Sequence, residues 1–108
     1  DAQLNLDILK TRICFYGHTH VPMAIFLAEG TMHIDRGGTF DLRNADKALI
    51  NVGSVGQPRD WDIRASYAIY DEKENIVHIK RVKYNIHDTV NKIYTAGLPE
   101  VNALRLMG

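Results

Sequence analysis

Two histidines, His18 and His20, stand one residue apart directly after the apolar run Ile13–Tyr16 and Gly17. If residues 17–20 are extended, both imidazoles leave the same side of the chain, with their Cα atoms roughly 7 Å apart. Such a pair can ligate one metal ion, or one each of two metal ions about 3.5–4 Å apart. A solvated loop is the alternative, because a His-x-His spacing alone is a weak metal signature.

A second polar segment, residues 51–60 (NVGSVGQPRD), also has the composition of a binding loop. Its backbone N–H groups at positions 53–56 and the guanidinium of Arg59 can together hold a phosphate oxygen. Alternatively, the glycines and Pro58 only shape a long connection, and Arg59 pairs with Asp60 or Asp62. We favour the structural role for the glycines and leave both roles open for Arg59.

The other conspicuous side chains have more ordinary interpretations. Trp61 is either a platform for a nucleobase or a cover over a sheet edge, and the second role is the commoner one. The basic stretch of residues 80–83 is expected to be a solvated strand face. His33 and His78 alternate with apolar residues in expected strands and are read as solvated or hydrogen-bonded histidines.

Length and composition restrict the class of protein. The 108 residues suffice for one domain, and 13 basic residues balance 13 acidic ones, so no specific nucleic-acid binding is expected. Cys14 is the only cysteine and cannot form an internal disulfide, which favours a reducing, cytoplasmic location. No apolar run approaches the roughly 20 residues of a membrane-spanning helix, so no membrane partner is expected.

The elements that must position these residues are mainly strands. The apolar pattern predicts the end of a helix over residues 4–9 and a helix through Val90 and Tyr94, with Asn85 or Asp88 as its cap. A short helix is expected over residues 99–107. Glycines in residues 36–38 favour a hairpin loop. Strands are expected over residues 13–16, 23–28, 31–35, 39–42, 48–52, 66–71 and 76–84, the last two forming an antiparallel hairpin.

Five segments, in order, carry a resemblance to a known family. GHTHVP at residues 17–22, after an apolar strand, resembles the last motif of the calcineurin-like metallophosphoesterases, in particular their small prokaryotic phosphatase and phosphodiesterase branch. Residues 51–60 resemble the loop that follows in that branch, and residues 64–68 resemble the next strand start. AGLP at residues 96–99 and the closing RLMG resemble the C-terminal end of the family.

The resemblance implies an α/β fold: the C-terminal part of a four-layer α/β/β/α sandwich, with mainly antiparallel or mixed sheets and C-terminal helices. It also implies two divalent metal ions (manganese, iron, zinc or nickel), with His18 a ligand of the second and His20 of the first. Asn51 and Arg59, both in the 51–60 loop, are the candidate substrate-binding residues. The implied reaction is attack on phosphorus by a metal-bridging hydroxide, so this chain contributes no catalytic acid, base or nucleophile.

The earlier motifs of the family, Asp-x-His, Gly-Asp-x-x-Asp and Gly-Asn-His-Asp/Glu, do not occur in this sequence. We therefore expect residues 1–108 to be the C-terminal portion of a single metallophosphoesterase domain, inactive alone. The start at Asp1 rather than at a methionine fits this expectation. The expected partners are the N-terminal part of the same domain and a phosphate-ester substrate.

Two rival hypotheses stay open. In the first, the chain is a non-catalytic, protein-binding scaffold of the same fold, although a scaffold has no need for paired metal ligands. Alternatively, it is a small free-standing metal-binding β domain that draws further ligands from His33, His78 or Cys14.

Overall fold

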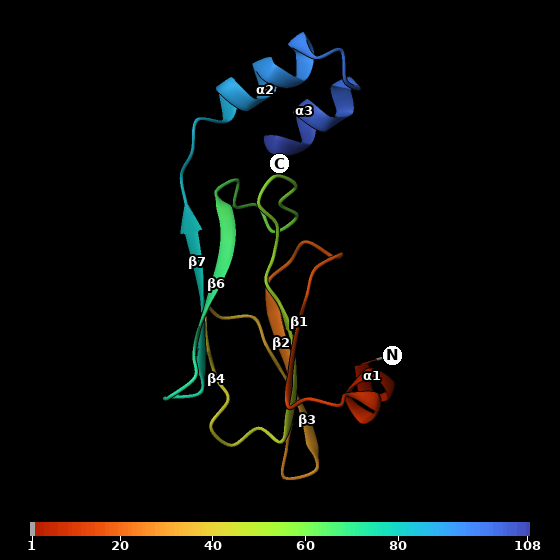
Figure 1. The fold of residues 1–108 in the computed structure, drawn as a ribbon, viewed down its shortest axis with the longest axis vertical. Coiled ribbons are helices and arrows are strands. Elements are labelled where there is room, and N and C mark those ends of the chain that lie inside the picture. Colours follow the sequence, from red (N-terminus) through yellow and green to blue (C-terminus); the bar gives the residue numbers. More distant parts are fainter. Residues whose placement is uncertain (1) are drawn as a thin grey trace.

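The computed structural model describes residues 2–108 and shows two β-sheets, one helix near the N-terminus and two helices at the C-terminus (Figure 1). The molecule is elongated, with principal extents of 52 × 27 × 21 Å. Its elements, in chain order, are α1 (Ala2–Ile8), β1 (Ile13–Tyr16), β2 (Met23–Ala28), β3 (Thr31–Asp35), β4 (Thr39–Asp41), β5 (Lys47–Asn51), β6 (Ala65–Asp71), β7 (Ile76–Val82), α2 (Ile86–Thr95) and α3 (Glu100–Leu106).

The first sheet has the strand order β1-β5-β2-β3. Strand β1 runs parallel to β5, with Tyr16 opposite Asn51, whereas β2 runs antiparallel to both β5 and β3. Because β1 and β5 are parallel, their carboxyl ends lie at the same edge of the sheet. The histidine segment and the 51–60 segment therefore begin side by side.

The second sheet has the order β4-β7-β6 and is wholly antiparallel. Strands β6 and β7 form the predicted hairpin, with Asp71 opposite Ile76 across the turn. The mixed α/β architecture, with mixed and antiparallel sheets and C-terminal helices, confirms the predicted fold class. No helix among residues 2–108 is long and apolar enough to cross a membrane.

The hydrophobic core lies between the two sheets. Side chains alternate between the faces of a strand, so Ala48 and Ile50 of β5 point to the same face as Ala24 of β2. This face meets Phe40 of β4 and Val77 of β7, both fully buried. Burial of such a large apolar side chain contributes about 1.5–3 kcal/mol, which fixes the packing of the sheets.

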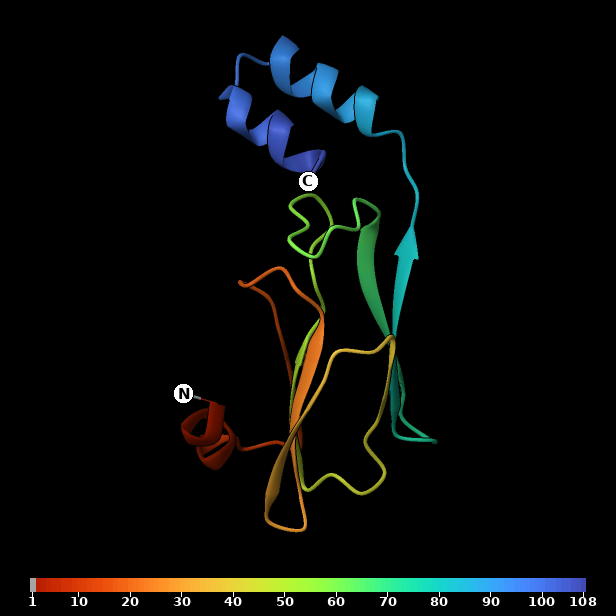
Figure 2. The same ribbon diagram turned by 180° about the vertical axis from the view of Figure 1, so that it is seen from behind.

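Helix α1 covers the opposite face of the first sheet, so the layers run α1, first sheet, second sheet (Figure 2). The Lys47 side chain of β5 ties the helix end to this sheet. Its Nζ donates to the carbonyls of Leu6 and Leu9, at 3.1 and 3.3 Å. A cation at the C-terminus of a helix satisfies carbonyls that have no partner within the helix.

The prediction of a hairpin at residues 36–38 was wrong. Strand β3 belongs to the first sheet and β4 to the second, so residues 36–38 cross between the sheets. The glycine-rich composition allows such a crossing as well as it allows a tight turn. Long-range packing decided between them, because the crossing places Phe40 in the core opposite Val77 of β7.

The two C-terminal helices form a hairpin beyond the ends of both sheets, next to the loop that leaves β5, and Leu106 of α3 lines the same depression as His20 (Figures 1 and 2). The predicted cap Asn85 is confirmed, since its side chain accepts a hydrogen bond from the N–H of Asp88. Val90 of α2 and Leu106 of α3 are buried against each other. The hairpin thus places α3 close to the histidine segment.

Candidate active site

The histidine segment is a bend rather than an extended strand end. His18 has φ 86° and His20 has φ 65°, so both lie in the left-handed region. The condition of an extended segment at residues 17–20, under which both imidazoles would leave the same side of the chain, is therefore not met. Non-glycine residues in this region cost of order 1–3 kcal/mol each and persist only where surrounding contacts hold them.

Asn51, at the end of β5, supplies those contacts. Its side chain is fully buried, and its Nδ2 donates to the Gly17 carbonyl at 3.2 Å and to Thr19 Oγ1 at 2.7 Å. Its Oδ1 accepts a hydrogen bond from the N–H of Gly53 at 2.9 Å. One amide therefore joins the histidine segment to the 51–60 loop. That Asn51 binds substrate stays a prediction; in the structure all three of these bonds go to protein groups.

Replacing Asn51 with alanine should lower the free energy of unfolding by about 1–3 kcal/mol, the usual cost of leaving buried polar groups unpaired. The carbonyl of Gly17 and the N–H of Gly53 both lose their partner. Urea denaturation followed by circular dichroism measures this loss. Thr19→Val, which removes a single acceptor, should cost less. Equal losses for the two variants would contradict the role of Asn51 as the common anchor.

His20 is held in one orientation by the neighbouring loop. The residue is half-buried, and its Nδ1 lies 2.8 Å from the carbonyl oxygen of Gln57. Since a carbonyl oxygen only accepts, Nδ1 carries the hydrogen, and in the neutral ring Nε2 keeps its lone pair. Metal-bound histidines commonly donate their second ring N–H to a carbonyl in this way.

The surroundings of His20 are open enough for a ligand. His20 lines a shallow depression of about 480 Å³ with Ser54, Gln57 and Leu106. His18 is exposed on the same bend. Neither imidazole is sealed in an apolar interior, so both fit the chemistry of metal ligands.

The described part of the chain offers an incomplete ligand set. Among residues 2–108 there is no group of three or more histidine, cysteine, aspartate or glutamate side chains that could hold a metal ion. His33 instead stacks on Phe26, with ring centroids 5.2 Å apart. Cys14 is half-buried and lines a separate apolar pocket under α1. The hypothesis of a complete, free-standing metal site built from this chain alone therefore gains no support.

The loop after β5 is anchored at its start by hydrogen bonds from Ser66 of β6. Ser66 Oγ donates to the Val52 carbonyl at 2.8 Å, and the Ser66 N–H donates to the Ser54 carbonyl at 3.0 Å. Ser54 Oγ then accepts from the N–H of Gln57 at 2.9 Å. These bonds fix the position of the loop relative to β6, and hence the position of the Gln57 carbonyl that His20 contacts.

Arg59 is exposed, and no ion pair or hydrogen bond of its guanidinium is found among residues 2–108. The alternative that it pairs with Asp60 or Asp62 was wrong, because those carboxylates bind Arg81 and Arg64. Arg59 shares a shallow depression of about 280 Å³ with Arg105 of α3. Two arginines that line one depression favour an anion there.

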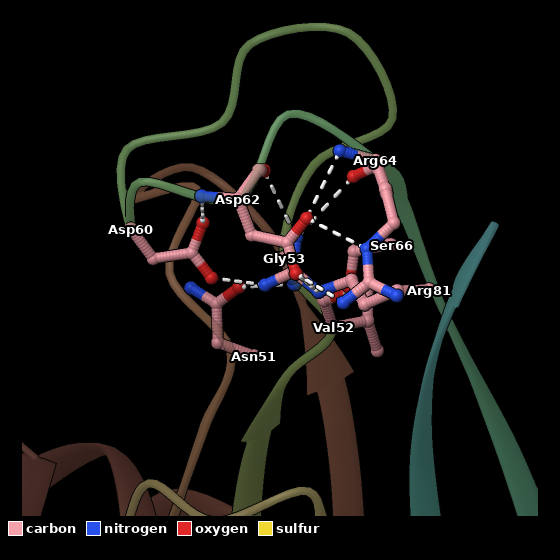
Figure 3. Close-up of polar contacts among 8 residues, drawn as sticks. All are labelled: Asn51, Val52, Gly53, Asp60, Asp62, Arg64, Ser66 and Arg81. Carbon is pink, nitrogen blue, oxygen red and sulfur yellow. Dashed lines mark hydrogen bonds and ion pairs between the residues drawn. The ribbon is translucent and has the colours of Figure 1, made fainter. Parts of the chain in front are cut away.

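An ion-pair cluster holds the far end of the same loop (Figure 3). Arg64 donates to both carboxylate oxygens of Asp62, at 3.0 and 2.7 Å, and Arg81 pairs with Asp60. The expectation that residues 80–83 form a solvated basic face was wrong for Arg81, whose side chain is only 13% exposed. The sequence did contain a sign of this burial. Arg81 follows Val77 and Ile79 at every second position of β7, and side chains two residues apart in a strand lie on the same face, here the inner one.

The pKa of Asp62 lies well below its ordinary value, mainly because the Arg64 side chain and then the Arg64 N–H donate hydrogen bonds to the carboxylate, with a smaller contribution from the charge of Arg81. A carboxyl group whose pKa is lowered by folding stabilises the protein above its unfolded pKa and loses that effect as the pH falls.

Asp62→Asn should therefore reduce the stability of the protein slightly at neutral pH. Below pH 4, near the ordinary pKa of 3.8, the variant should lose less stability than the wild type as the pH falls. Thermal unfolding of both proteins across the acid range measures this. The effect should be small because the Arg64 side chain is 45% exposed, so solvent screens the pair. Parallel curves at all pH values would contradict it.

Trp61 does not cover a sheet edge, the role that the sequence favoured. Its side chain is fully exposed and its φ is 68°. Residues 60 and 62 on either side carry the ion pairs of the cluster, so the chain turns outward between two anchored carboxylates. Long-range anchoring of this kind cannot be read from the residues RDWD alone.

Comparisons with known proteins agree with this architecture. A scan against models of protein families finds no match. The sequence is 43% identical over 88 residues to an uncharacterized protein of Methanocaldococcus jannaschii, MJ0912, an alignment that covers 82% of this chain and 35% of that protein. The fold matches the crystal structure of a metallophosphoesterase from Sphaerobacter thermophilus, with a TM-score of 0.81 and 43% identity, over 97% of this chain and 44% of that one.

The match in fold to this metallophosphoesterase is thus accompanied by clear sequence similarity. This chain belongs to the metallophosphoesterase family and corresponds to the C-terminal part of the Sphaerobacter protein. The matched part spans 35% of the length of the Methanocaldococcus protein and 44% of that of the Sphaerobacter protein.

Proposed function

We propose that this chain is the C-terminal portion of a metal-dependent phosphoesterase domain, a phosphatase or phosphodiesterase that hydrolyses phosphate esters. Its His18 and His20 are metal ligands in this proposal. The hydrogen bond from His20 Nδ1 to the Gln57 carbonyl is the observation that carries the proposal, because it leaves the Nε2 lone pair available on a residue that lines an open depression.

Two divalent metal ions, of manganese, iron, zinc or nickel, would supply an activated water and neutralise charge on the phosphate oxygens. The residues of this chain have supporting tasks. His20 keeps a fixed tautomer and orientation through Gln57, and Asn51 holds the bend that carries both histidines. Arg59, whose guanidinium has no partner among residues 2–108, binds a non-bridging phosphate oxygen of the substrate.

The remaining metal ligands come from the N-terminal part of the same domain, which is the main partner of residues 1–108. The described residues lack a third ligand near the pair, and the relatives are more than twice as long as the aligned segments. A reducing cytoplasm remains the expected location, since Cys14 has no possible disulfide partner within the chain.

Hydrolysis of a generic phosphodiester, bis(p-nitrophenyl) phosphate, by the complete protein tests this function. We expect turnover with Mn²⁺, its loss after chelation with EDTA, and its recovery when Mn²⁺ returns. Metal analysis of the active protein should give two ions per chain. A complete protein that binds no divalent metal and hydrolyses neither a phosphomonoester nor a phosphodiester would refute the proposal and favour the scaffold.

A further inference from the structure

Arg81 of β7 joins the second sheet to the loop that follows β5. Its guanidinium pairs with the carboxylate of Asp60, and its Nη1 lies 3.5 Å from the Asp62 carbonyl and 3.4 Å from the Arg64 carbonyl (Figure 3). The side chains of Arg81 and Asp60 are only 13% and 21% exposed. A pair this buried is costly to open, because either charge alone would be left poorly solvated.

The Arg81–Asp60 pair lies next to the residues that follow the histidine bend. It lines one depression together with Val21 and Pro22, which directly follow His20. The pair is therefore placed against the end of the bend, while the loop it anchors contacts His20 itself through Gln57.

Only two residues separate the anchored Asp60 from Gln57. One of them is Pro58, which is buried and has a fixed φ, and the other is Arg59, whose guanidinium pairs with no described residue. A short, stiff connection of this kind passes a displacement of Asp60 directly to the Gln57 carbonyl. It also sets where the base of the Arg59 side chain lies.

We propose that Arg81 is a positioning residue for the metal site: by holding Asp60, it fixes the Gln57 carbonyl that orients His20 and the backbone that carries Arg59. The inference rests on the proposed function in one respect, that His20 ligates a metal ion. The orientation of the His20 ring by Arg81 does not depend on that function. Arg81 does not touch the metal or the substrate. Its effect passes through Asp60, Pro58 and Gln57.

The decisive test is the tautomer of His20 in the complete, metal-free protein. Nitrogen-15 NMR of labelled histidine, at a pH where imidazole is neutral, distinguishes hydrogen on Nδ1 from hydrogen on Nε2. We expect the wild type to show the Nδ1–H form. Arg81→Met and Asp60→Asn should both show a mixture in which the Nε2–H form appears. Loss of stability alone would lower the folded population without changing the tautomer of the molecules that remain folded.

Two further variants sharpen the result. Arg81→Lys keeps the charge opposite Asp60 but lacks the planar fork that reaches two carbonyls, so its tautomer ratio should fall between those of wild type and Arg81→Met. Arg43→Met is the matched control, because Arg43 forms an exposed pair with Asp41, at 2.6 Å, away from the loop. It should leave the His20 signal unchanged.

Metal titration provides the second readout. The affinity of the complete protein for Mn²⁺ should fall about tenfold in Arg81→Met, in the range found for outer partners of metal ligands. If Arg81→Met does not fold, the near-isosteric Asp60→Asn decides. Unchanged His20 tautomers in the folded variants would overturn the inference. Shifted tautomers in a protein whose wild type binds no metal would refute the proposed function and uphold the positioning role.

Discussion

Replacing His20 with alanine in the complete protein should lower the affinity for Mn²⁺ by more than about a hundredfold. Loss of an outer partner alone costs about 10- to 100-fold, and loss of the ligand itself should exceed this. Turnover of bis(p-nitrophenyl) phosphate at limiting Mn²⁺ should fall in parallel. The variant should remain folded, because the half-buried ring makes one hydrogen bond, to the Gln57 carbonyl. Calorimetric titration and initial rates measure the two effects.

His18→Ala should change both quantities in the same direction, and His33→Ala serves as the matched control. His33 is exposed on β3 and stacks on Phe26, so its loss removes an imidazole without approaching the bend. If the His20 and His33 variants have the same metal affinity and turnover, His20 is not a ligand. Unchanged turnover in both His18 and His20 variants would favour the protein-binding scaffold.

Gly53→Ala should lower the free energy of unfolding by about 2–5 kcal/mol, the largest loss of stability that we expect from any one-atom addition to this chain. Gly53 has φ 84°, a left-handed conformation that costs L-residues about 1–2 kcal/mol. An added Cβ would also lie 2.6 Å from Ser66 Oγ and 2.8 Å from Pro22 Cγ. Overpacking of this kind adds about 1–3 kcal/mol.

Gly30→Ala is the control that separates the two contributions. Gly30 has φ 77° in the β2–β3 turn, and an added Cβ there would meet no atom within 4 Å. It should cost only the backbone strain. Denaturant unfolding of the two variants measures both losses, and equal values would show that the contacts of Gly53 with Ser66 and Pro22 carry no cost.

The strands were predictable because their patterns are local. Ile13–Tyr16 and Met23–Ala28 are confirmed with their expected bounds, and β5 is displaced by one residue from the expected 48–52. The β6–β7 hairpin followed from alternation on both sides of a polar turn. The Asn85 cap was likewise visible, because a cap contacts residues three positions away.

The geometry of the site was not predictable, because distant contacts decide it. Asn51 shapes the histidine bend across 32 to 34 residues, and the Gln57 carbonyl orients His20 across 37. Every residue has a backbone carbonyl, so the residue type at position 57 could not predict this contact. Arg81 differed: its alternation with Val77 and Ile79 placed it on the inner face, where a charge needs a partner.

The pairing of β1 with β5 has a consequence for the order of folding. Ile13 lies opposite Ala48, so 34 intervening residues must be arranged before this pairing forms, whereas β6 and β7 meet across a four-residue turn. Closing the shorter loop costs less entropy, and hairpins form within about 1–10 μs. Pulse-labelled hydrogen exchange should accordingly protect β6–β7 first and the Asn51 side of the bend last. On the proposed function, capture of a metal ion by the histidine bend would therefore follow the assembly of both sheets.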